Sequence, residues 1–455
     1  MTRHPMHSWI RRAFGLLSLA VLWPLEGCTH DLLQVTNPDI IQDANTPSGA
    51  IALKNGVILR LEQVTAGLGG NGPDNLFIYS GLLADEWRSG DTFVQRNDMD
   101  QRLFDPTNTF LAGPFRALNR VRVQGQTTIA QLRTYSPTPA SNIGLMFAVT
   151  AFVENLAGEY YCNGIPLSGA QADGSIVYGD PISDDSAFAL AAATADSAAA
   201  NQPGPDSARV RQLASIIKGR ALLNRGLFAA AATAVSLVAD TFHYDATYSA
   251  NAGQNEIWNL NTSIKRYTMG DNEGGNGLPF SSANDPRIPR KIGGPVFDSA
   301  TPLVAILQGI WGRYSAVRIA TGIEARLIEA EAALQAGQVT TWLNALNALR
   351  GNTALYPAPQ TGYTSGPALT PLADPGTRPA RENLMFRERA FWMFGTGHRL
   401  GDLRRLARQY GRPVESVYPT GLYVKGGLYG NAVSLPIPQD EQNNPRFVQC
   451  SDRNP

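Results

Sequence analysis

The fold of this chain is decided by residues 381–410, RENLMFRERAFWMFGTGHRLGDLRRLARQY. Apolar side chains recur there at helical spacing, at Phe386, Ala390, Met393 and Phe394. One face of a helix is therefore apolar and has to be covered by other helices. The sequence Gly395-Thr396-Gly397 can end this helix, because glycine tolerates positive φ, and a second helix follows from His398. The stretch predicts two packed helices joined by a glycine-rich turn.

Charged side chains occupy many of the remaining positions of both helices. Asp402 lies four residues after His398, and Glu388 stands among arginines before the turn. One interpretation makes His398 and Asp402 an acid/base pair or two metal ligands. The other makes the carboxylates and guanidinium groups a network that locks the helices together. No third ligand or nucleophile with a recognisable spacing accompanies the pair, so the second interpretation is favoured.

Blocks near the end of the chain resemble the C-terminal signature of the SusD/RagB family of nutrient-binding outer-membrane lipoproteins. They are ERAFWMFGTGHRLGDLRRL (388–406), LPIPQDE (435–441) and NNP (443–445). Two positions depart from the family pattern. Thr396 stands where an acidic residue often precedes the Gly-His-Arg, and Leu400-Gly401 stands where an aromatic pair often follows it.

The resemblance implies a mostly α fold. The expected architecture is a SusD-like α-superhelix with tetratricopeptide-like helix pairs and a large irregular, loop-rich ligand-binding part, in one domain over residues 28–455. It also implies a SusC-like, TonB-dependent outer-membrane transporter as partner, a glycan or peptide ligand, no enzymatic activity and no cofactor.

The N-terminus has the layout of a secretory leader. Basic residues precede a short apolar run, 13–25, which is interrupted by Pro24 and is too short to span a bilayer comfortably. A soluble helix is the alternative, but this run has no polar face. Leu25-Glu26-Gly27-Cys28 resembles a lipobox, which implies removal of residues 1–27, acylation of the Cys28 sulfur and a lipid anchor in the outer membrane.

Composition excludes some function classes and leaves two cysteines to pair. The 455 residues are 43% hydrophobic and carry a formal net charge of +0, so no basic field favours nucleic acid. Of 3 cysteines, Cys28 would be lipidated, which leaves Cys162 and Cys450 in an oxidising compartment. A disulfide between them is favoured over two unrelated thiols, although sequence alone cannot show their proximity.

Helical patterns cover most of the chain before residue 410. Single helices are predicted at 50–63, 115–135, 143–161 and 187–200. Two helix-turn-helix pairs follow, at 208–224 with 227–239 and at 324–335 with 342–350. Small residues at the contacts of each pair permit close approach, as in tetratricopeptide units, which bury their faces by stacking. Residues 187–242 and 315–410 are therefore predicted to form a tetratricopeptide-like half.

Residues 243–314 form the predicted loop-rich insert. The segment 256–260 is strand-like, and 74–100 is expected to be a second irregular stretch. Aromatic side chains in these segments are candidates for stacking on a ligand, because long irregular segments in compact proteins tend to be functional. They are Trp87, Trp258, Tyr267, Trp311 and Tyr314. The alternative for each of them is a place in the core.

Three functions remain. The first is a lipid-anchored nutrient-binding protein that serves a transporter. The second is a tetratricopeptide-type adaptor that binds only protein. The third is a secreted glycoside hydrolase, which needs two carboxylates. Asp85, Glu86, Asp184 and Asp185 are available for that role, but nothing singles them out. The common nucleophile, phosphate-binding and zinc motifs do not occur, which favours binding over catalysis.

Overall fold

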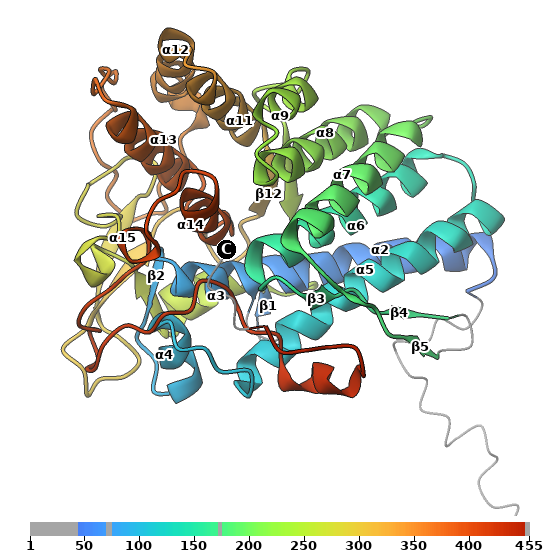
Figure 1. Cartoon of the computed structure of the whole chain (residues 1–455), viewed down its shortest axis with the longest axis horizontal. Coiled ribbons are helices and arrows are strands. Elements are labelled where there is room, and N and C mark those ends of the chain that lie inside the picture. Colours follow the sequence, from blue (N-terminus) through green and yellow to red (C-terminus); the bar gives the residue numbers. More distant parts are fainter. Residues whose placement is uncertain (1–43, 70–74, 172–174, 451–455) are drawn as a thin grey trace, which may run out of the picture. The chain divides into compact units, whose positions relative to one another are not determined.

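The computed structural model describes residues 44–69, 75–171 and 175–450. The predicted leader, Cys28 and the start of the mature chain lie outside these ranges. From Ala44 onward the chain forms one compact unit, and its regular structure is mostly α-helical, as predicted (Figure 1).

The helices are distributed over the whole length of this unit. In chain order they are α2 (Pro47–Thr65), α3 (Leu76–Leu83), α4 (Val94–Asp100), α5 (Thr109–Tyr135), α6 (Ser141–Tyr160), α7 (Asp184–Ala200), α8 (Ser207–Asn224), α9 (Phe228–Val235), α10 (Glu256–Trp258), α11 (Gly322–Gln335), α12 (Val339–Gly351), α13 (Arg378–Trp392), α14 (Arg399–Arg408) and α15 (Val414–Val417). Shorter helical turns are η2 (Asn259–Ser263), η3 (Glu273–Gly275), η4 (Thr353–Leu355) and η5 (Gln439–Asn443).

The strands are short and pair two by two. The antiparallel pairs are β1 (Leu68–Gly69) with β8 (Gln254–Asn255), β2 (Trp87–Ser89) with β9 (Tyr267–Met269), β3 (Ile165–Pro166) with β6 (Pro181–Ile182), β4 (Gly169–Ala170) with β5 (Ile176–Val177), β7 (His243–Ala246) with β12 (Val317–Thr321), and β10 (Arg290–Pro295) with β11 (Val304–Gln308). None of the described strands therefore joins a larger sheet.

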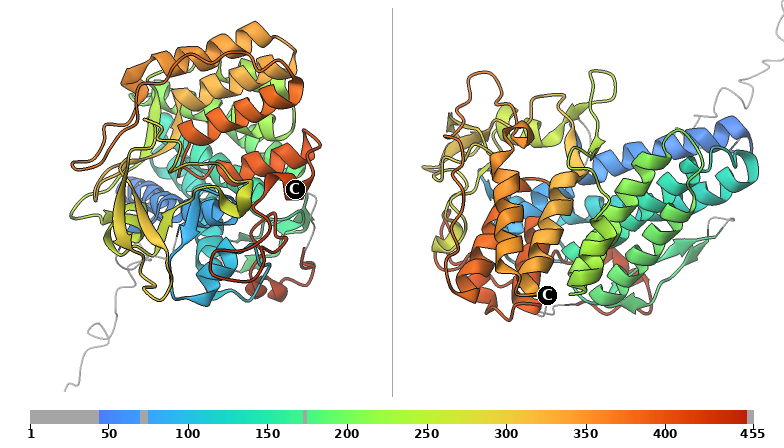
Figure 2. Two further views of the ribbon diagram at one scale, coloured as in Figure 1. Left: turned by 90° about the vertical axis from the view of Figure 1, so that its left-hand side faces the viewer. Right: turned by 90° about the horizontal axis from the view of Figure 1, so that it is seen from above.

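The long helices pack in a continuous array. In space the order is α2, α5, α6, α7 and α8, and the array continues through α9 and α11 to α12 and α13. The right-hand view of Figure 2 shows this row of neighbouring helices. The pairs α8/α9 and α11/α12 are the two predicted tetratricopeptide-like units. Helix α9 ends at Val235, earlier than the predicted 239.

Other sequence expectations need correction. The stretch 74–100, expected to be irregular, contains α3, β2 and α4. The segment 256–260, predicted as strand-like, is helical in α10 and η2. The reason is a local cap, because the Asn255 side chain accepts a hydrogen bond from the Trp258 backbone N–H at 3.2 Å and so starts a helical turn.

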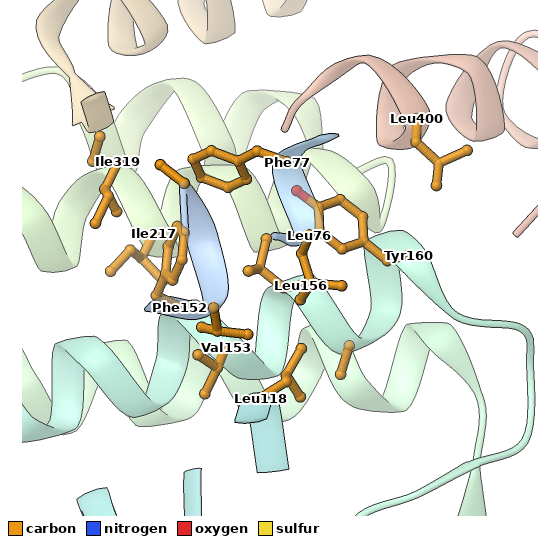
Figure 3. Close-up of a cluster of buried hydrophobic side chains, with 14 of the residues drawn as sticks. Leu76, Phe77, Leu118, Phe152, Val153, Leu156, Tyr160, Ile217, Ile319 and Leu400 are labelled. Atoms are coloured by element: carbon orange, nitrogen blue, oxygen red, sulfur yellow. The ribbon is translucent and has the colours of Figure 1, made fainter. Parts of the chain in front are cut away.

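Helix α3 lies at the centre of the core. All of its residues from Leu76 to Leu83 are buried, as expected for a helix that is apolar on every side. Figure 3 shows Leu76 and Phe77 of α3 among side chains of α5, α6, α8, β12 and α14. The labelled neighbours are Leu118, Phe152, Val153, Leu156, Tyr160, Ile217, Ile319 and Leu400. The helical array therefore closes around a helix that sequence periodicity alone did not reveal.

The glycine-rich turn of residues 381–410 has the predicted form. Gly395 and Gly397 have φ of +68° and +79°, and they separate α13 from α14. Arg389 of α13 donates to both carboxylate oxygens of Asp402 in α14, at 3.0 and 3.1 Å, and so bridges the turn. Arg405 donates to Asp402 at 2.8 Å and to Glu331 of α11. Charge pairing therefore fixes both helices against the tetratricopeptide-like pair, as the favoured interpretation predicted.

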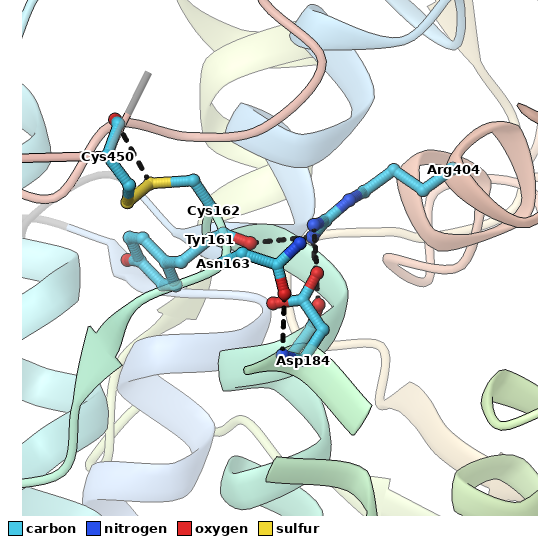
Figure 4. Close-up of a disulfide and its surroundings, with 7 residues drawn as sticks. Tyr161, Cys162, Asn163, Asp184, Arg404 and Cys450 are labelled. Carbon is cyan, nitrogen blue, oxygen red and sulfur yellow. Dashed lines mark hydrogen bonds and ion pairs between the residues drawn. A yellow bond between two sulfur atoms is a disulfide. The ribbon is translucent and has the colours of Figure 1, made fainter. Parts of the chain in front are cut away.

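Cys162 and Cys450 form a disulfide in the structure, with their Cα atoms 6.0 Å apart (Figure 4). The bridge ties the end of the described chain to the segment that follows α6. Beside it, Arg404 of α14 donates to the carbonyl oxygen of Tyr161 at 2.7 Å. In purified protein the bridge stays a prediction, and alkylation of both thiols without reductant would contradict it.

Candidate ligand-binding site

A cavity of about 510 Å³ opens where the insert meets the tetratricopeptide-like helices. Its lining comes from segments that are far apart in the sequence, 240–243, 310–323, 354–358 and 391–396, together with Arg287. The antiparallel pair β7 and β12 brings the first two segments together, since it closes the insert at its base. The turn after α13 supplies the last, so the stretch that fixes the fold also builds one wall of the cavity.

Aromatic side chains form much of the lining. Phe242, Trp311, Tyr356 and Trp392 all line the cavity. Tyr356 and Trp392 meet edge to face, with ring centroids 5.5 Å apart. Trp311 is 5% exposed and packs on the turn at Gly395, where a Cβ would lie 2.9 Å from its Cη2 atom. Phe242, Tyr356 and Trp392 are half-buried, and flat rings of this kind can stack on the apolar face of a ligand.

A buried ion network holds the Trp392 wall in place. The Cζ atom of Arg287 lies 5.1 Å from the Trp392 ring centroid, and its guanidinium donates to Asp285 and to Glu388 at 2.7 Å each. Burial raises the pKa of Asp285, but the hydrogen bonds and charge of Arg287 outweigh burial and hold that pKa below its usual value. Arg350 donates to the same Glu388 at 2.8 Å. The cavity wall is therefore rigid before any ligand arrives.

Exposed polar side chains form another part of the cavity lining, which we call its polar mouth. Nδ1 of His243 lies 2.7 Å from Asp245 Oδ2, and Arg318 donates to the same carboxylate at 2.9 and 3.0 Å. His243 and Arg318 line the cavity and are exposed. They can orient the hydroxyl or carbonyl groups of a ligand whose apolar face lies on the rings.

His398 and Asp402 do not form an acid/base pair. His398 Nδ1 is 3.0 Å from the Thr396 carbonyl oxygen, and its Nε2 is 3.5 Å from Glu324 Oε1. Burial raises the pKa of Glu324, but the charges of Arg220 and His398 outweigh it and lower the pKa to about 2. Asp402 is occupied by Arg389 and Arg405. Within the described ranges no three His, Cys, Asp or Glu side chains gather as a metal site.

The carboxylates considered for hydrolysis are used elsewhere. Arg399 donates to both oxygens of Asp85 at 2.6 and 2.8 Å, Arg404 binds Asp184, and Arg225 donates to Asp185 at 3.0 Å. Glu86 is buried, and burial raises its pKa to about 8. None of these residues lines the cavity.

The predicted stacking residues divide into separate groups. Trp87 and Tyr267 are fully buried, so the prediction that they contact ligand is corrected to a core role. Trp87 packs on Phe394 with centroids 5.0 Å apart. Trp311 lines the cavity. For each predicted stacking residue a place in the core was the alternative, and only the packing of the folded chain distinguishes a core residue from a ligand contact.

Trp258 and Tyr314 both lie near the Arg313 guanidinium. The Cζ atom of Arg313 lies 5.9 Å from the Trp258 ring centroid and 5.2 Å from that of Tyr314. Tyr314 is 41% exposed. We call these three side chains the Arg313 platform. Arg313 and Tyr314 directly precede Ser315, which lines the cavity.

Sequence analysis missed Phe242, Tyr356 and Trp392. Trp392 did carry a signal, because it lies off the apolar face defined by Phe386 and Ala390 and is nevertheless a large aromatic residue. Phe242 and Tyr356 lie in connecting segments, where periodicity gives no information on side-chain direction.

Comparison with known proteins shows the fold. No family model matches the sequence, and no curated protein does. Solved structures match over most of the chain. A SusD-like carbohydrate binding protein from Bacteroides fragilis NCTC 9343 has a TM-score of 0.64 and 14% sequence identity, and the match covers 89% of this chain and 99% of that chain.

Two further structures are similar. A SusD-like carbohydrate binding protein from Bacteroides vulgatus ATCC 8482 has a TM-score of 0.63 and 11% identity, with 89% of this chain and 97% of that chain covered. A SusD superfamily protein from Parabacteroides distasonis ATCC 8503 has a TM-score of 0.61 and 14% identity, with 89% and 98% covered. The chain therefore has the SusD-like fold, and the fold predicted from its C-terminal motifs is confirmed.

Proposed function

We propose that this protein is a lipid-anchored outer-membrane binding protein. It captures a nutrient, which is a glycan, an oligosaccharide or a peptide, and delivers it to a SusC-like, TonB-dependent transporter. Cys28 would carry the anchor. Among the described residues, no helix combines the length and the apolar character that a bilayer crossing needs. The proposed membrane attachment therefore rests on the lipobox-like sequence.

The observation that carries the proposal is the aromatic cavity with its polar mouth. Among the described residues that line it, Asp240 is the only carboxylate. Glycoside hydrolysis normally needs two carboxyl groups on either side of the bond, so this lining fits binding better than catalysis. Two of the structures with this fold are described as carbohydrate binding proteins, which favours a sugar over a peptide as ligand.

The first test is substitution in the cavity. Trp392→Ala and Tyr356→Ala should each weaken oligosaccharide binding by about 1–3 kcal/mol, because each removes a stacking surface. Calorimetric titration against a panel of soluble oligosaccharides measures this change, and melting of each variant shows whether it remains folded. Trp258→Ala and Tyr314→Ala tell whether the Arg313 platform extends the same site.

Tyr178→Ala is the matched control, since Tyr178 is 37% exposed and does not line the cavity. It should leave affinity unchanged. Unaltered affinity in folded Trp392 and Tyr356 variants would place the binding surface outside the cavity.

The second test addresses anchoring and the transporter. The wild-type chain should sediment with outer membranes and, after detergent extraction, bring down a barrel transporter that mass spectrometry identifies. Cys28→Ala should appear in the soluble fraction, because acylation needs the sulfur. Retention of Cys28→Ala in membranes would refute the lipid anchor. Capture of soluble proteins without any barrel would favour the adaptor function instead.

A further inference from the structure

Two exposed phenylalanine rings flank one arginine at a place away from the cavity. Phe93 precedes α4, Phe297 follows β10, and each is 44% exposed. The Cζ atom of Arg266 lies 3.8 Å from the Phe297 ring centroid and 5.2 Å from that of Phe93. None of these residues lines the cavity. Two large apolar rings and a stacked guanidinium therefore lie together at the surface, where a ligand can reach them.

The three side chains stand on a rigid base. Asp91 is fully buried, and its carboxylate binds both Arg266 and Arg96. Backbone hydrogen bonds join the segments that carry the rings. The Gly90 N–H donates to the Arg266 carbonyl oxygen at 2.8 Å, and the Phe297 N–H donates to that of Lys265 at 3.0 Å. The arrangement is therefore fixed before a ligand binds, which lowers the entropic cost of binding.

Backbone strain accompanies this arrangement. Lys265, directly before Arg266, has a φ of +56°, a conformation that a lysine rarely adopts. Its side chain donates to the Gly293 carbonyl oxygen at 2.6 Å, which holds the residue in place. Strain of this kind costs about 1–3 kcal/mol and clusters at functional sites, where the surrounding structure maintains it.

Arg266 keeps hydrogen-bonding capacity for a ligand. Its Nη1 binds Asp91, while Nε and Nη2 donate no side-chain hydrogen bond within the described part of the chain. The side chain is 19% exposed. The nearby carboxylate of Asp298 is matched by Lys425 at 3.0 Å, and Asp91 is also paired with Arg96. Three cations, Arg266, Arg96 and Lys425, therefore accompany the two carboxylates Asp91 and Asp298.

We propose that Arg266, Phe93 and Phe297 form a second binding site, which takes an acidic oligosaccharide. A uronate carboxylate accepts hydrogen bonds from the planar guanidinium, and the C–H face of the sugar ring lies on an exposed ring. This inference rests on the proposed function, since it names the class of glycan that the protein takes. An acidic peptide could supply the same carboxylate, but it lacks the flat ring face that matches the phenylalanine surfaces.

The test compares tetragalacturonate with its methyl ester, which has nearly the same shape but no charge. Calorimetric titration of the mature chain should show binding of the acid that is tighter by about tenfold or more, because the charge-assisted hydrogen bonds are lost in the ester. Arg266→Gln should abolish this preference, and Arg266→Lys should keep part of it. Phe297→Ala should weaken binding of both compounds.

Arg446→Gln serves as the control, because Arg446 is an exposed arginine paired with Asp180 at 2.9 Å and is remote in sequence from Arg266. It should bind like wild type. The acidic-glycan site would be overturned if the acid and the ester bind equally well, or if neither binds. It would also be overturned if the preference for the acid survives in Arg266→Gln, or if a glutamate tetrapeptide binds as tightly as tetragalacturonate. The transporter pull-down and the Trp392 variants report on the proposed function independently of these outcomes.

Discussion

Gly397→Ala is expected to lower the free energy of unfolding by roughly 3–5 kcal/mol, through overpacking added to left-handed backbone strain. A Cβ at this position would overlap the Tyr160 hydroxyl and the Phe77 ring. Both neighbours are at most 1% exposed and cannot move outward, and the Tyr160 hydroxyl donates to the Gly397 carbonyl oxygen at 2.7 Å. Urea unfolding monitored by circular dichroism measures the change.

Gly337→Ala provides the matched control. Gly337 ends α11 with a φ of +73°, close to the +79° of Gly397, but a Cβ there would meet no atom within 4 Å. Only backbone strain applies, so the expected loss is about 1 kcal/mol. If Gly397→Ala does not fold at all while Gly337→Ala folds normally, the loss of stability is larger than the expected range and the packing argument is still supported. Equal losses in the two variants would contradict the packing argument.

Glu86→Gln should make the protein more stable than wild type in alkaline solution and nearly equal to it in mildly acidic solution. Glu86 is fully buried, and its Oε1 accepts a hydrogen bond from the Gly395 backbone N–H at 3.0 Å. Burial, aided by the charge of Asp85, raises its pKa from 4.5 to about 8. The carboxyl group is therefore neutral in the folded protein at pH 7.

Proton linkage determines whether stability rises or falls with pH. Between pH 4.5 and about 8, the folded protein holds a proton on Glu86 that the unfolded chain has lost, so stability falls as pH rises through this window. Glutamine has no proton to lose. The stability of the variant relative to wild type should therefore rise from about pH 5 to about pH 8.5, by roughly 5 kcal/mol as an upper bound.

Urea unfolding of both proteins across this pH range measures the difference. Asp185→Asn is the control, since Asp185 is exposed and paired with Arg225, and surface pairs contribute little. A constant difference between Glu86→Gln and wild type over the whole range would show that Glu86 is ionised in the folded protein, contrary to the expectation.

Much of the helical scaffold could be predicted from local patterns. The turn between α13 and α14 could be predicted because its signals lie within a few residues of one another. They are the glycines Gly395 and Gly397 and the apolar spacing of Phe386 and Ala390. The tetratricopeptide-like pairs could also be predicted, because their helical periods and turns are local features of the sequence. Helix α3 was missed because a helix that is apolar on all sides has no amphipathic period.

The binding surfaces could be predicted only in part. The sequence drew attention to aromatic residues, and Trp311 does line the cavity while Trp258 and Tyr314 share a platform. Trp87 and Tyr267 have the same chemical character, yet they lie in the core. Amino-acid type shows that a ring must be covered by something, but it does not show whether protein or ligand provides the cover.

The sequence by itself determined the helix-turn-helix of residues 381–410 and the helix pairs, because backbone preference and apolar period are encoded locally. The SusD-like fold was predicted from the resemblance of the C-terminal motifs to that family. Only the tertiary structure decided the partners of the buried charges and the composition of the cavity. Arg399 binds Asp85 across 314 positions, and Arg287 binds Glu388 across 101. Many arginines and carboxylates could pair by charge alone, and packing selects the pairs by bringing particular side chains within hydrogen-bonding distance.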